Sequence, residues 1–374
     1  MKITTANRRQ DSGERSGDPS AASDALPAAY RLPPDATKEA ISPVEPRVVF
    51  IEATNRCNLH CKTCPRTFFE LEPPRTLSFR RFSHIVDQFP AMERALLHGI
   101  GEPLINPQLP RMIAHLKKRG VDVLINSNGT LLTPRRQQAL IDSGLDAYRC
   151  SIDAGRAATF MRIRGEDQFQ RVTEGIRGLV RAKHHANAKR PAISLWCVAT
   201  RENLSELPDV VRLAARLGVP AVYLQRMVYF VGPGEETYGL ARKELTIFGK
   251  LEEGEEAIID QCEALGEELG VTLHASGARG PRSSLSDARS AQSAPWQACM
   301  RPWTAAYVTA NGNALPCCIA PFATREYTSL ILGNVFEQPF EAIWKSKPYR
   351  DFRTQLMSAH PPAPCTGCGV HWSL

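Results

Sequence analysis

Residues 48–64 read VVFIEATNRCNLHCKTC, a short apolar run followed by three closely spaced cysteines. The apolar run at 48–52 has the length and β-branched content of a buried strand. Cys57, Cys61 and Cys64 follow in one loop, where three thiolates can hold three irons of a [4Fe–4S] cube. Ordinary cluster sites use four cysteines, so this loop would leave one coordination position open. Zinc, or three cysteines without a metal, is the alternative that these residues leave open.

The C-x3-C-x2-C spacing, preceded by Glu-Ala-Thr-Asn-Arg at 52–56, resembles the radical S-adenosylmethionine (SAM) superfamily. In that family the open iron chelates SAM through its amino and carboxylate groups. An electron from the cluster then cleaves SAM to a 5′-deoxyadenosyl radical. The resemblance therefore implies a [4Fe–4S] cluster on these cysteines, SAM as cofactor, and abstraction of a hydrogen atom from the substrate.

Short apolar runs alternate with amphipathic stretches downstream of the cysteine loop. We expect strands at 48–52, 95–98, 121–126, 147–152, 193–199 and 221–225, and helices at 79–87, 107–119, 134–143, 167–185 and 205–217. Such alternation predicts an α/β fold with a parallel sheet. Six units match the partial (β/α)6 barrel of the radical SAM family, in which chemistry takes place at the C-terminal ends of the strands.

Composition shifts divide the chain into four predicted segments. We expect a flexible N-terminal arm at 1–45, the barrel at 46–230, a helical connector with a mobile loop at 231–295, and a small cysteine-rich unit at 296–374. Within the connector we expect a helix at 242–269, a strand at 271–273 and a mobile loop at 276–293.

Glycine-rich or polar turns follow the predicted strands. The turn at 98–103 reads H-G-I-G-E-P and resembles the GGE motif that binds the SAM amino group, and the turn at 126–130 resembles a T-N-G turn beside the SAM methionine. A serine on strand four and the arginine of an R-x-R-G stretch contact SAM in the resembled families, and a guanidinium suits a carboxylate. The resemblance implies SAM contacts from Gly99, Gly101, Glu102, Asn128, Ser151, Asp153, Arg164 and Gln225. Turns and surface residues are the plainer interpretation of each motif taken alone.

A second set of cysteines lies near the C-terminus: Cys299, Cys317, Cys365 and Cys368. Asn311-Gly312 between two apolar runs predicts a hairpin that returns Cys317 towards Cys299. Four thiolates fill a cluster completely. The arrangement resembles the SPASM and twitch extensions of radical SAM proteins, and it implies one auxiliary [4Fe–4S] cluster. Structural zinc is the alternative, and we expect Cys318 to be a spare thiol.

The other three cysteines, Cys150, Cys197 and Cys262, are expected to be buried small apolar residues. An epimerase would need a thiol that donates a hydrogen atom, so each is also a candidate for that role.

The composition indicates in which cellular compartment the protein is expected and which partners it is expected to lack. The 374 residues are 43% apolar and 23% charged, with a net charge of +7 and neither a signal peptide nor an apolar run long enough to span a membrane. We therefore expect a cytoplasmic protein in a reducing compartment, whose eleven cysteines are ligands and free thiols. The scattered arginines form no nucleic-acid-binding pattern, so neither nucleic acid nor membrane is an expected partner.

The resemblance implies a radical SAM oxidoreductase that acts on a small polar metabolite such as an alcohol or an amino sugar. An auxiliary cluster with four thiolates would accept an electron from the substrate radical, and a flavodoxin or ferredoxin would supply electrons. The catalytic base is not identified; His98 and Arg226, at strand ends, are speculative candidates. A peptide maturase is a second hypothesis, which the short stretch before residue 46 disfavours. A redox-neutral epimerase and a non-enzymatic metal-cluster scaffold are further alternatives.

Overall fold

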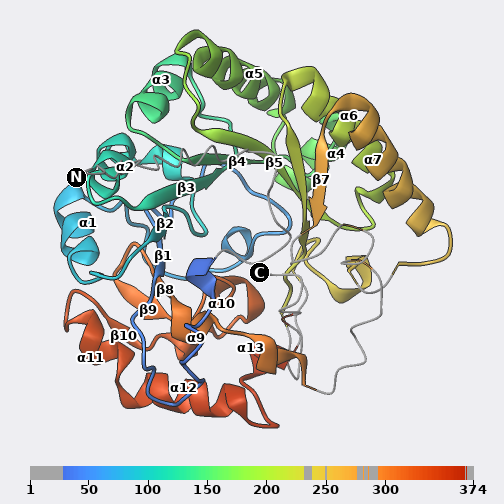
Figure 1. Cartoon of the computed structure of the whole chain (residues 1–374). Coiled ribbons are helices and arrows are strands. Elements are labelled where there is room, and N and C mark those ends of the chain that lie inside the picture. Colours follow the sequence, from blue (N-terminus) through green and yellow to red (C-terminus); the bar gives the residue numbers. More distant parts are fainter. Residues whose placement is uncertain are drawn as a thin grey trace, which may run out of the picture.

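A computed structural model describes residues 28–230, 238–248, 251–275, 281, 285, 294–366 and 368. Its centre is one ten-stranded sheet with the strand order β10-β9-β8-β1-β2-β3-β4-β5-β6-β7 (Figure 1). The strands are β1 (Val48–Ile51), β2 (Arg94–Leu96), β3 (Asp122–Ser127), β4 (Ala147–Ser151), β5 (Ala192–Ala199), β6 (Ala221–Arg226), β7 (Thr272–Ala275), β8 (Ala305–Val308), β9 (Asn313–Leu315) and β10 (Gly333–Asn334).

Strands β1 to β7 are parallel and follow one another in chain order, because each is linked to the next by helical crossover segments. The crossover helices are α1 (Phe79–Val86), α2 (Leu109–Lys117), α3 (Pro134–Asp142), α4 (Ala157–Arg164), α5 (Phe169–His185), α6 (Leu207–Leu217) and α7 (Glu255–Leu269). Figure 1 shows these helices along the outer side of the curved sheet. The predicted α/β fold with a parallel sheet is confirmed.

Three details of the barrel differ from the sequence prediction. The stretch at 157–164 forms helix α4, whereas the sequence was read there only as an R-x-R-G segment. The predicted helix at 242–269 begins at Glu255, since Gly254 before it takes a left-handed φ of 86° that ends the preceding turn. The strand expected at 271–273 forms β7 and gives the barrel a seventh parallel strand.

The two faces of the sheet pack differently because successive side chains of a strand point to opposite sides. Val49, Ile51 and Leu97 belong to the larger apolar core, which lies between the sheet and the crossover helices. Phe50 and Leu96 face the other way, into a smaller core on the concave side. The concave side of β1 to β3 is therefore covered by protein, and this cover comes from the C-terminal unit together with residues 29–32.

The C-terminal unit extends the barrel sheet rather than forming a separate one. The predicted hairpin is confirmed as β8 and β9, with Gly312 at φ 92° in its turn, and β8 pairs in parallel with β1. Short helices complete the unit: α9 (Arg301–Thr304), α10 (Ala320–Ala323), α11 (Phe340–Trp344), α12 (Lys347–Met357) and α13 (Ala363–Thr366). Trp303 and Tyr307 from this unit enter the concave core.

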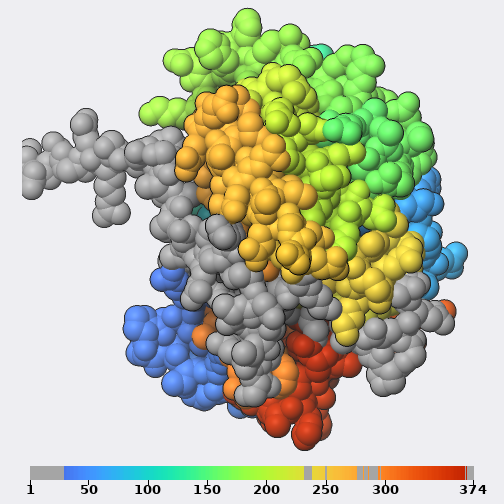
Figure 2. All heavy atoms as spheres, turned by 90° about the vertical axis from the view of Figure 1, so that its right-hand side faces the viewer, coloured from blue at the N-terminus to red at the C-terminus, as the bar shows by residue number. Residues whose placement is uncertain are grey.

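Residues 28–45 of the predicted arm lie against the C-terminal unit. Trp303 Nε1 donates a hydrogen bond to the Glu39 carbonyl at 2.7 Å, and Trp344 Nε1 donates to the Val44 carbonyl at 2.9 Å. Figure 2 shows this segment, in blue, beside the orange and red C-terminal residues. Residues 1–27 and, apart from 281 and 285, the predicted mobile loop at 276–293 lie outside the described residues. Across the described ranges, no helix combines the length and apolar character needed to cross a membrane.

Candidate functional site

The loop after β1 gathers Cys57, Cys61 and Cys64 at the C-terminal edge of the barrel sheet. Cys61 is buried, and the other two are partly exposed. The Cys64 backbone N–H donates to the Cys61 carbonyl at 3.2 Å, which folds the second half of the loop into a turn. Cys57 and Cys64 are close enough to neighbouring thiols of the loop for these to raise their pKa values. The described residues contain no trio of side chains arranged around a single metal ion, whereas a cube binds each thiolate to a different iron.

Burial sets the protonation of these thiols. Burial raises the pKa of Cys57, and it raises the pKa of Cys64 to about 12. Without a metal, both thiols are therefore protonated at neutral pH. A metal that binds here must displace these protons, and the donor set of three adjacent thiols fits a soft, thiophilic metal centre.

Two of the residues predicted to contact SAM lie within reach of the cysteine sulfurs. Asn128 Nδ2 lies 3.7 Å from Cys57 Sγ, and Arg164 Nη1 lies 3.8 Å from Cys61 Sγ. Both contacts are geometrically suited to N–H donation towards sulfur. Such neighbours orient thiolate ligands and tune the metal that the thiolates hold.

Arg164 is held in place by a buried ion pair. Its Nη2 lies 2.6 Å from Asp153 Oδ2, and Asp153 also accepts a hydrogen bond from the Val198 N–H at 2.7 Å. Burial opposes the charge on Arg164, but Asp153 and Cys61 outweigh burial and raise the pKa of the guanidinium. Burial raises the pKa of Asp153 despite the cation beside it. The Nε atom of Arg164 is buried without a hydrogen-bond partner in the described chain, so it remains available to a ligand.

The glycine turn after β2 packs tightly against the end of β1 and the cysteine loop. A Cβ on Gly99 would lie 2.2 Å from Glu52 Oε1, and one on Gly101 would lie 2.1 Å from the Thr54 carbonyl oxygen. Neither position can take a side chain without displacing its neighbour, so both glycines are required for this close approach. The turn is also fixed by a hydrogen bond from the Glu102 N–H to the Arg56 carbonyl at 2.8 Å.

The Glu102 carboxylate is occupied inside the protein. It accepts hydrogen bonds from Ser127 Oγ at 2.8 Å, from the Asn128 N–H at 2.6 Å and from the Leu104 N–H at 3.0 Å. Burial raises its pKa. The side chain of Glu102 therefore braces the turn after β3, which in turn presents Asn128 to Cys57.

Ser151 and Gln225 lie at the C-terminal ends of β4 and β6, and both are partly exposed on the concave side. Within the described residues, no hydrogen bond connects either side chain to the cysteine loop. The geometry thus groups Gly99, Gly101, Glu102, Asn128, Asp153 and Arg164 around the loop, and leaves Ser151 and Gln225 facing the barrel interior.

Glu52, at the end of β1, is a residue that the sequence reasoning did not single out. It is 2% exposed, and its carboxylate accepts hydrogen bonds from Tyr307 Oη at 2.5 Å, from the Ile100 N–H at 3.2 Å and from the Ala310 N–H at 3.1 Å. Burial raises the pKa of Glu52 to about 7. It joins the barrel, the glycine turn and the C-terminal unit. The available signal was a carboxylate that ends an otherwise apolar strand.

The second cysteine set comes together in the C-terminal unit. Cys299 precedes α9, Cys317 and Cys318 follow β9, Cys365 lies in α13, and Cys368 follows it. Electrostatic coupling connects Cys365 to Cys317, Cys368 and Cys299. Burial raises the pKa of Cys299 to about 11.

Arg301 is the cation of this second group, and sequence reasoning missed it. Burial opposes its charge, but Cys318, Cys299, Cys317 and Cys368 together raise its pKa. Its position two residues after Cys299 was the only local signal. Cys318 has the largest effect of these thiols on the pKa of Arg301, so it lies within the group, and its role as a spare thiol stays a prediction.

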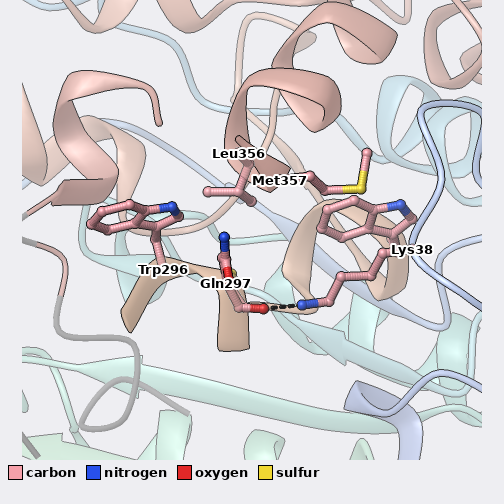
Figure 3. A pocket seen from close by; sticks show the side chains of 7 residues that line it. Lys38, Trp296, Gln297, Leu356 and Met357 are labelled. Atoms are coloured by element: carbon pink, nitrogen blue, oxygen red, sulfur yellow. Dashed lines mark hydrogen bonds between the residues drawn. The ribbon is translucent and has the colours of Figure 1, made fainter. Parts of the chain in front are cut away.

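A pocket of about 270 Å³ adjoins Cys299 on the outer side of the C-terminal unit (Figure 3). Trp296 and Trp303 are among the residues that line it, and Lys38 donates a hydrogen bond to the Gln297 carbonyl. Burial lowers the pKa of Lys38, whereas Cys299 raises it. The pocket shows that one edge of the second cysteine group is close to the molecular surface.

The remaining thiols lie away from both groups. Cys150, Cys197 and Cys262 are fully buried in the core between the sheet and the helices, which confirms them as packed apolar residues. His98 faces the concave side instead. Burial, and then the charge of Arg149, lower the pKa of His98 to about 3, so it is a weak base in the free protein. Burial also lowers the pKa of Arg226.

Two family models match the chain. One, described as the radical SAM superfamily, matches residues 51–214, and the other, described as an iron-sulfur cluster-binding domain and called SPASM, matches residues 299–369. The two matches together cover more than half of the chain and contain all seven predicted cluster cysteines.

Two curated relatives are similar in sequence. One is the tungsten-containing aldehyde ferredoxin oxidoreductase cofactor-modifying protein of Pyrococcus furiosus, with 31% identity. The match covers 49% of this chain and about half, 52%, of that protein's length. The AdoMet-dependent heme synthase of Nitratidesulfovibrio vulgaris is 25% identical over 85% of this chain and 84% of its own length.

Among solved structures, Streptococcus suis SuiB bound to precursor peptide SuiA superposes with a TM-score of 0.60. The two proteins are 14% identical, and the superposition covers 82% of this chain and 66% of SuiB. At this identity the likeness demonstrates a shared fold.

Proposed function

The chain belongs to the radical SAM superfamily and carries a C-terminal SPASM iron-sulfur domain, and from this premise we propose that it oxidises a small polar metabolite, such as an alcohol or an amino sugar. The protein is a radical SAM enzyme, and its cofactors are a [4Fe–4S] cluster with SAM and an auxiliary iron-sulfur cluster. The observation that carries the proposal is the second group of thiols around Arg301, which is fixed to the barrel sheet by the β8–β1 pairing.

In this proposal the two cysteine groups have different numbers of ligands. Cys57, Cys61 and Cys64 hold the first cluster and leave one iron for SAM. Cys299, Cys317, Cys365 and Cys368 complete the second cluster, which therefore has no open position and suits electron transfer. When bound, the cofactors supply one-electron chemistry: reductive cleavage of SAM and removal of a hydrogen atom from the substrate.

The chain's own residues arrange this chemistry. Asn128 and Arg164 orient the thiolates of Cys57 and Cys61, and the Gly99–Gly101 turn lets backbone approach the SAM amino group. Ser151 and Gln225, on the concave side, are positioned to bind SAM polar groups. The hydrogen atom taken from the substrate would end up in the methyl group of 5′-deoxyadenosine, one electron would pass to the second cluster and one proton to a base or to water, so the net change in the substrate would be a two-electron oxidation. A flavodoxin or ferredoxin is the proposed electron donor for SAM cleavage.

Three thiols are poorly placed for the epimerase alternative. A thiol that returns a hydrogen atom must reach the substrate, and Cys150, Cys197 and Cys262 are all on the helix side of the sheet, which weighs against each of them as the donor. Formation of a peptide crosslink is the second hypothesis, and an oxidised product from the alcohols or amino sugars of the test below would weigh against it.

The test is an anaerobic reconstitution with iron and sulfide, followed by reduction in the presence of SAM and a panel of alcohols and amino sugars. We expect 5′-deoxyadenosine together with a product that has lost two hydrogens, and deuterium transfer from the labelled substrate to 5′-deoxyadenosine. Cys368→Ala should keep SAM cleavage and lose the product. A protein with intact, reducible clusters that cleaves no SAM would refute the proposal.

A further inference from the structure

Two rows of side chains lie on the concave face of the barrel, one deeper than the other. Asn128, Ser151 and Gln225 occupy the strand ends, and because side chains alternate along a strand, the positions two residues earlier point to the same side. On β3 and β4 these deeper positions are Asn126 and Arg149, which are register partners across the two strands. His98 follows β2 on the same face as Leu96.

The deeper row carries polar groups with no partner. His98 Nδ1 and Asn126 Oδ1 are both buried, and neither has a hydrogen-bond partner among the described residues. Native proteins leave few buried polar atoms unpaired because each costs free energy. Two such atoms on neighbouring strands, facing the same interior, indicate a place where a ligand completes the hydrogen bonding.

Arg149 adds an unpaired positive charge to this row. No carboxylate in the described chain forms an ion pair with it, and Asp122, an acidic side chain that raises its pKa, is bound to Arg94 at 2.7 Å. Burial lowers the pKa of Arg149, and Arg94 lowers it further, whereas Tyr30, Tyr223 and Asp122 raise it. A guanidinium in such a site attracts an oxyanion that can bridge its two N–H edges.

A stack of three aromatic rings on β5, β6 and β7 holds the Arg149 guanidinium in position. Arg149 lies over the Trp196 ring at 4.4 Å from its centroid. Trp196 stacks on Tyr223, and Tyr223 on His274, each with ring centroids 4.5 Å apart. Trp196, Tyr223 and His274 are register partners on β5, β6 and β7, so the stack follows from the parallel pairing itself. None of the three rings belongs to an apolar core cluster of the described chain.

We propose that Arg149 anchors a carboxylate of the substrate, while His98 and Asn126 hydrogen-bond to its neighbouring polar groups. This inference rests on the proposed function, because it places the substrate one layer below the residues assigned to SAM. It narrows the substrate class to small hydroxy or amino compounds that carry a carboxylate. Bound carboxylate neutralises Arg149 and leaves neutral His98 free to donate or accept a hydrogen bond.

The first test measures binding to the reconstituted enzyme with SAM, using three probes of similar size: glucuronate, glucose 6-phosphate and glucose. We expect glucuronate to raise the melting temperature of the wild-type protein, and glucose to have no effect. Arg149→Met should weaken glucuronate binding by about 10- to 100-fold, the loss expected for a charge-assisted hydrogen-bonded pair. Arg149→Lys should keep part of the binding, and Arg162→Met, an exposed arginine on α4, should keep all of it.

Each other result contradicts the inference in a recognisable way. If glucuronate does not bind, or if it binds wild-type protein and Arg149→Met equally well, then Arg149 is not a carboxylate anchor. Stabilisation by glucose 6-phosphate alone assigns the site to phosphate instead.

The second test separates substrate from SAM and from a structural role. Arg149→Met should lower the yield of oxidised product with glucuronate far more than it lowers substrate-free 5′-deoxyadenosine formation, and it should leave the melting temperature unchanged or higher, because it removes an unpaired buried charge. Loss of SAM cleavage in this variant alone would assign Arg149 to SAM, and a marked loss of stability would assign it to the fold. Absence of SAM cleavage in the wild-type protein would instead refute the proposed function.

Discussion

Cys57, Cys61 and Cys64 lie in a single loop after β1, whereas Cys299, Cys317, Cys365 and Cys368 come from separate points of the C-terminal unit. The loop sulfurs have two N–H neighbours from the barrel, Asn128 and Arg164, and the C-terminal sulfurs share the cation Arg301. The comparison teaches that one ligand type can serve two purposes. Three thiols in a strand-end loop leave room for a cofactor, and four thiols collected by folding do not.

The largest expected effect concerns the membership of the second group. Cys317→Ala should reduce the iron content of the reconstituted protein from about eight to about four per chain, since the second cluster has no cofactor that could replace a missing thiolate ligand. Cys318→Ala is the matched control, because it removes the adjacent thiol, and it should keep about eight irons. Quantification of iron and sulfide in the two variants shows which of the two thiols is a cluster ligand. Equal iron loss in both variants would mean that the two thiols share the site.

The next largest effect concerns the ion pair that supports the first group. Arg164→Met leaves Asp153 buried without its partner, so we expect a loss of about 3–5 kcal/mol in the free energy of unfolding. Chemical denaturation measures the loss. Arg162→Met on the same helix breaks only a largely exposed pair with Glu202 and should cost less than about 1 kcal/mol. Equal denaturation midpoints for the two variants would show that the Arg164–Asp153 pair does not stabilise the site.

A smaller effect, which depends on pH, concerns the contact that joins the two regions. The pKa of Glu52 in the folded protein is raised to about 7, above its unfolded value. Its contribution to stability is therefore fully present at pH values below the unfolded pKa and is lost as the pH rises through 7. The upward shift of the Glu52 pKa corresponds to a change of about 3 kcal/mol in the free energy of unfolding. Thermal unfolding between pH 5 and pH 8 should show a steeper decline for the wild type than for Glu52→Gln, and parallel curves would contradict this assignment.

Local patterns were sufficient for much of the fold. The apolar runs located the strands from β1 to β6, and the Asn311-Gly312 turn located the β8–β9 hairpin, because both signals come from neighbouring residues. The parallel pairing of β8 with β1 could not be predicted, since it joins segments more than two hundred residues apart. Helix α4 was missed because its sequence has only a weak apolar periodicity.

The candidate site shows the same division. Cysteine spacing and the glycine turn identified the loop and its neighbours, and the structure brings Asn128 and Arg164 to the sulfurs as additional support. Glu52, Arg301 and Arg149 were not found, because each acts on residues that are distant in the chain or on another strand. Their environment exists only after the sheet has formed.

The most direct test of the two-site account is SAM cleavage without substrate in a matched pair of variants, Cys61→Ala and Cys368→Ala, each reconstituted anaerobically and reduced with dithionite. The account predicts that Cys61→Ala forms no 5′-deoxyadenosine, and that Cys368→Ala forms it as the wild-type protein does. Cleavage by Cys61→Ala, or its loss from both variants alike, would contradict the assignment of the radical chemistry to the loop after β1.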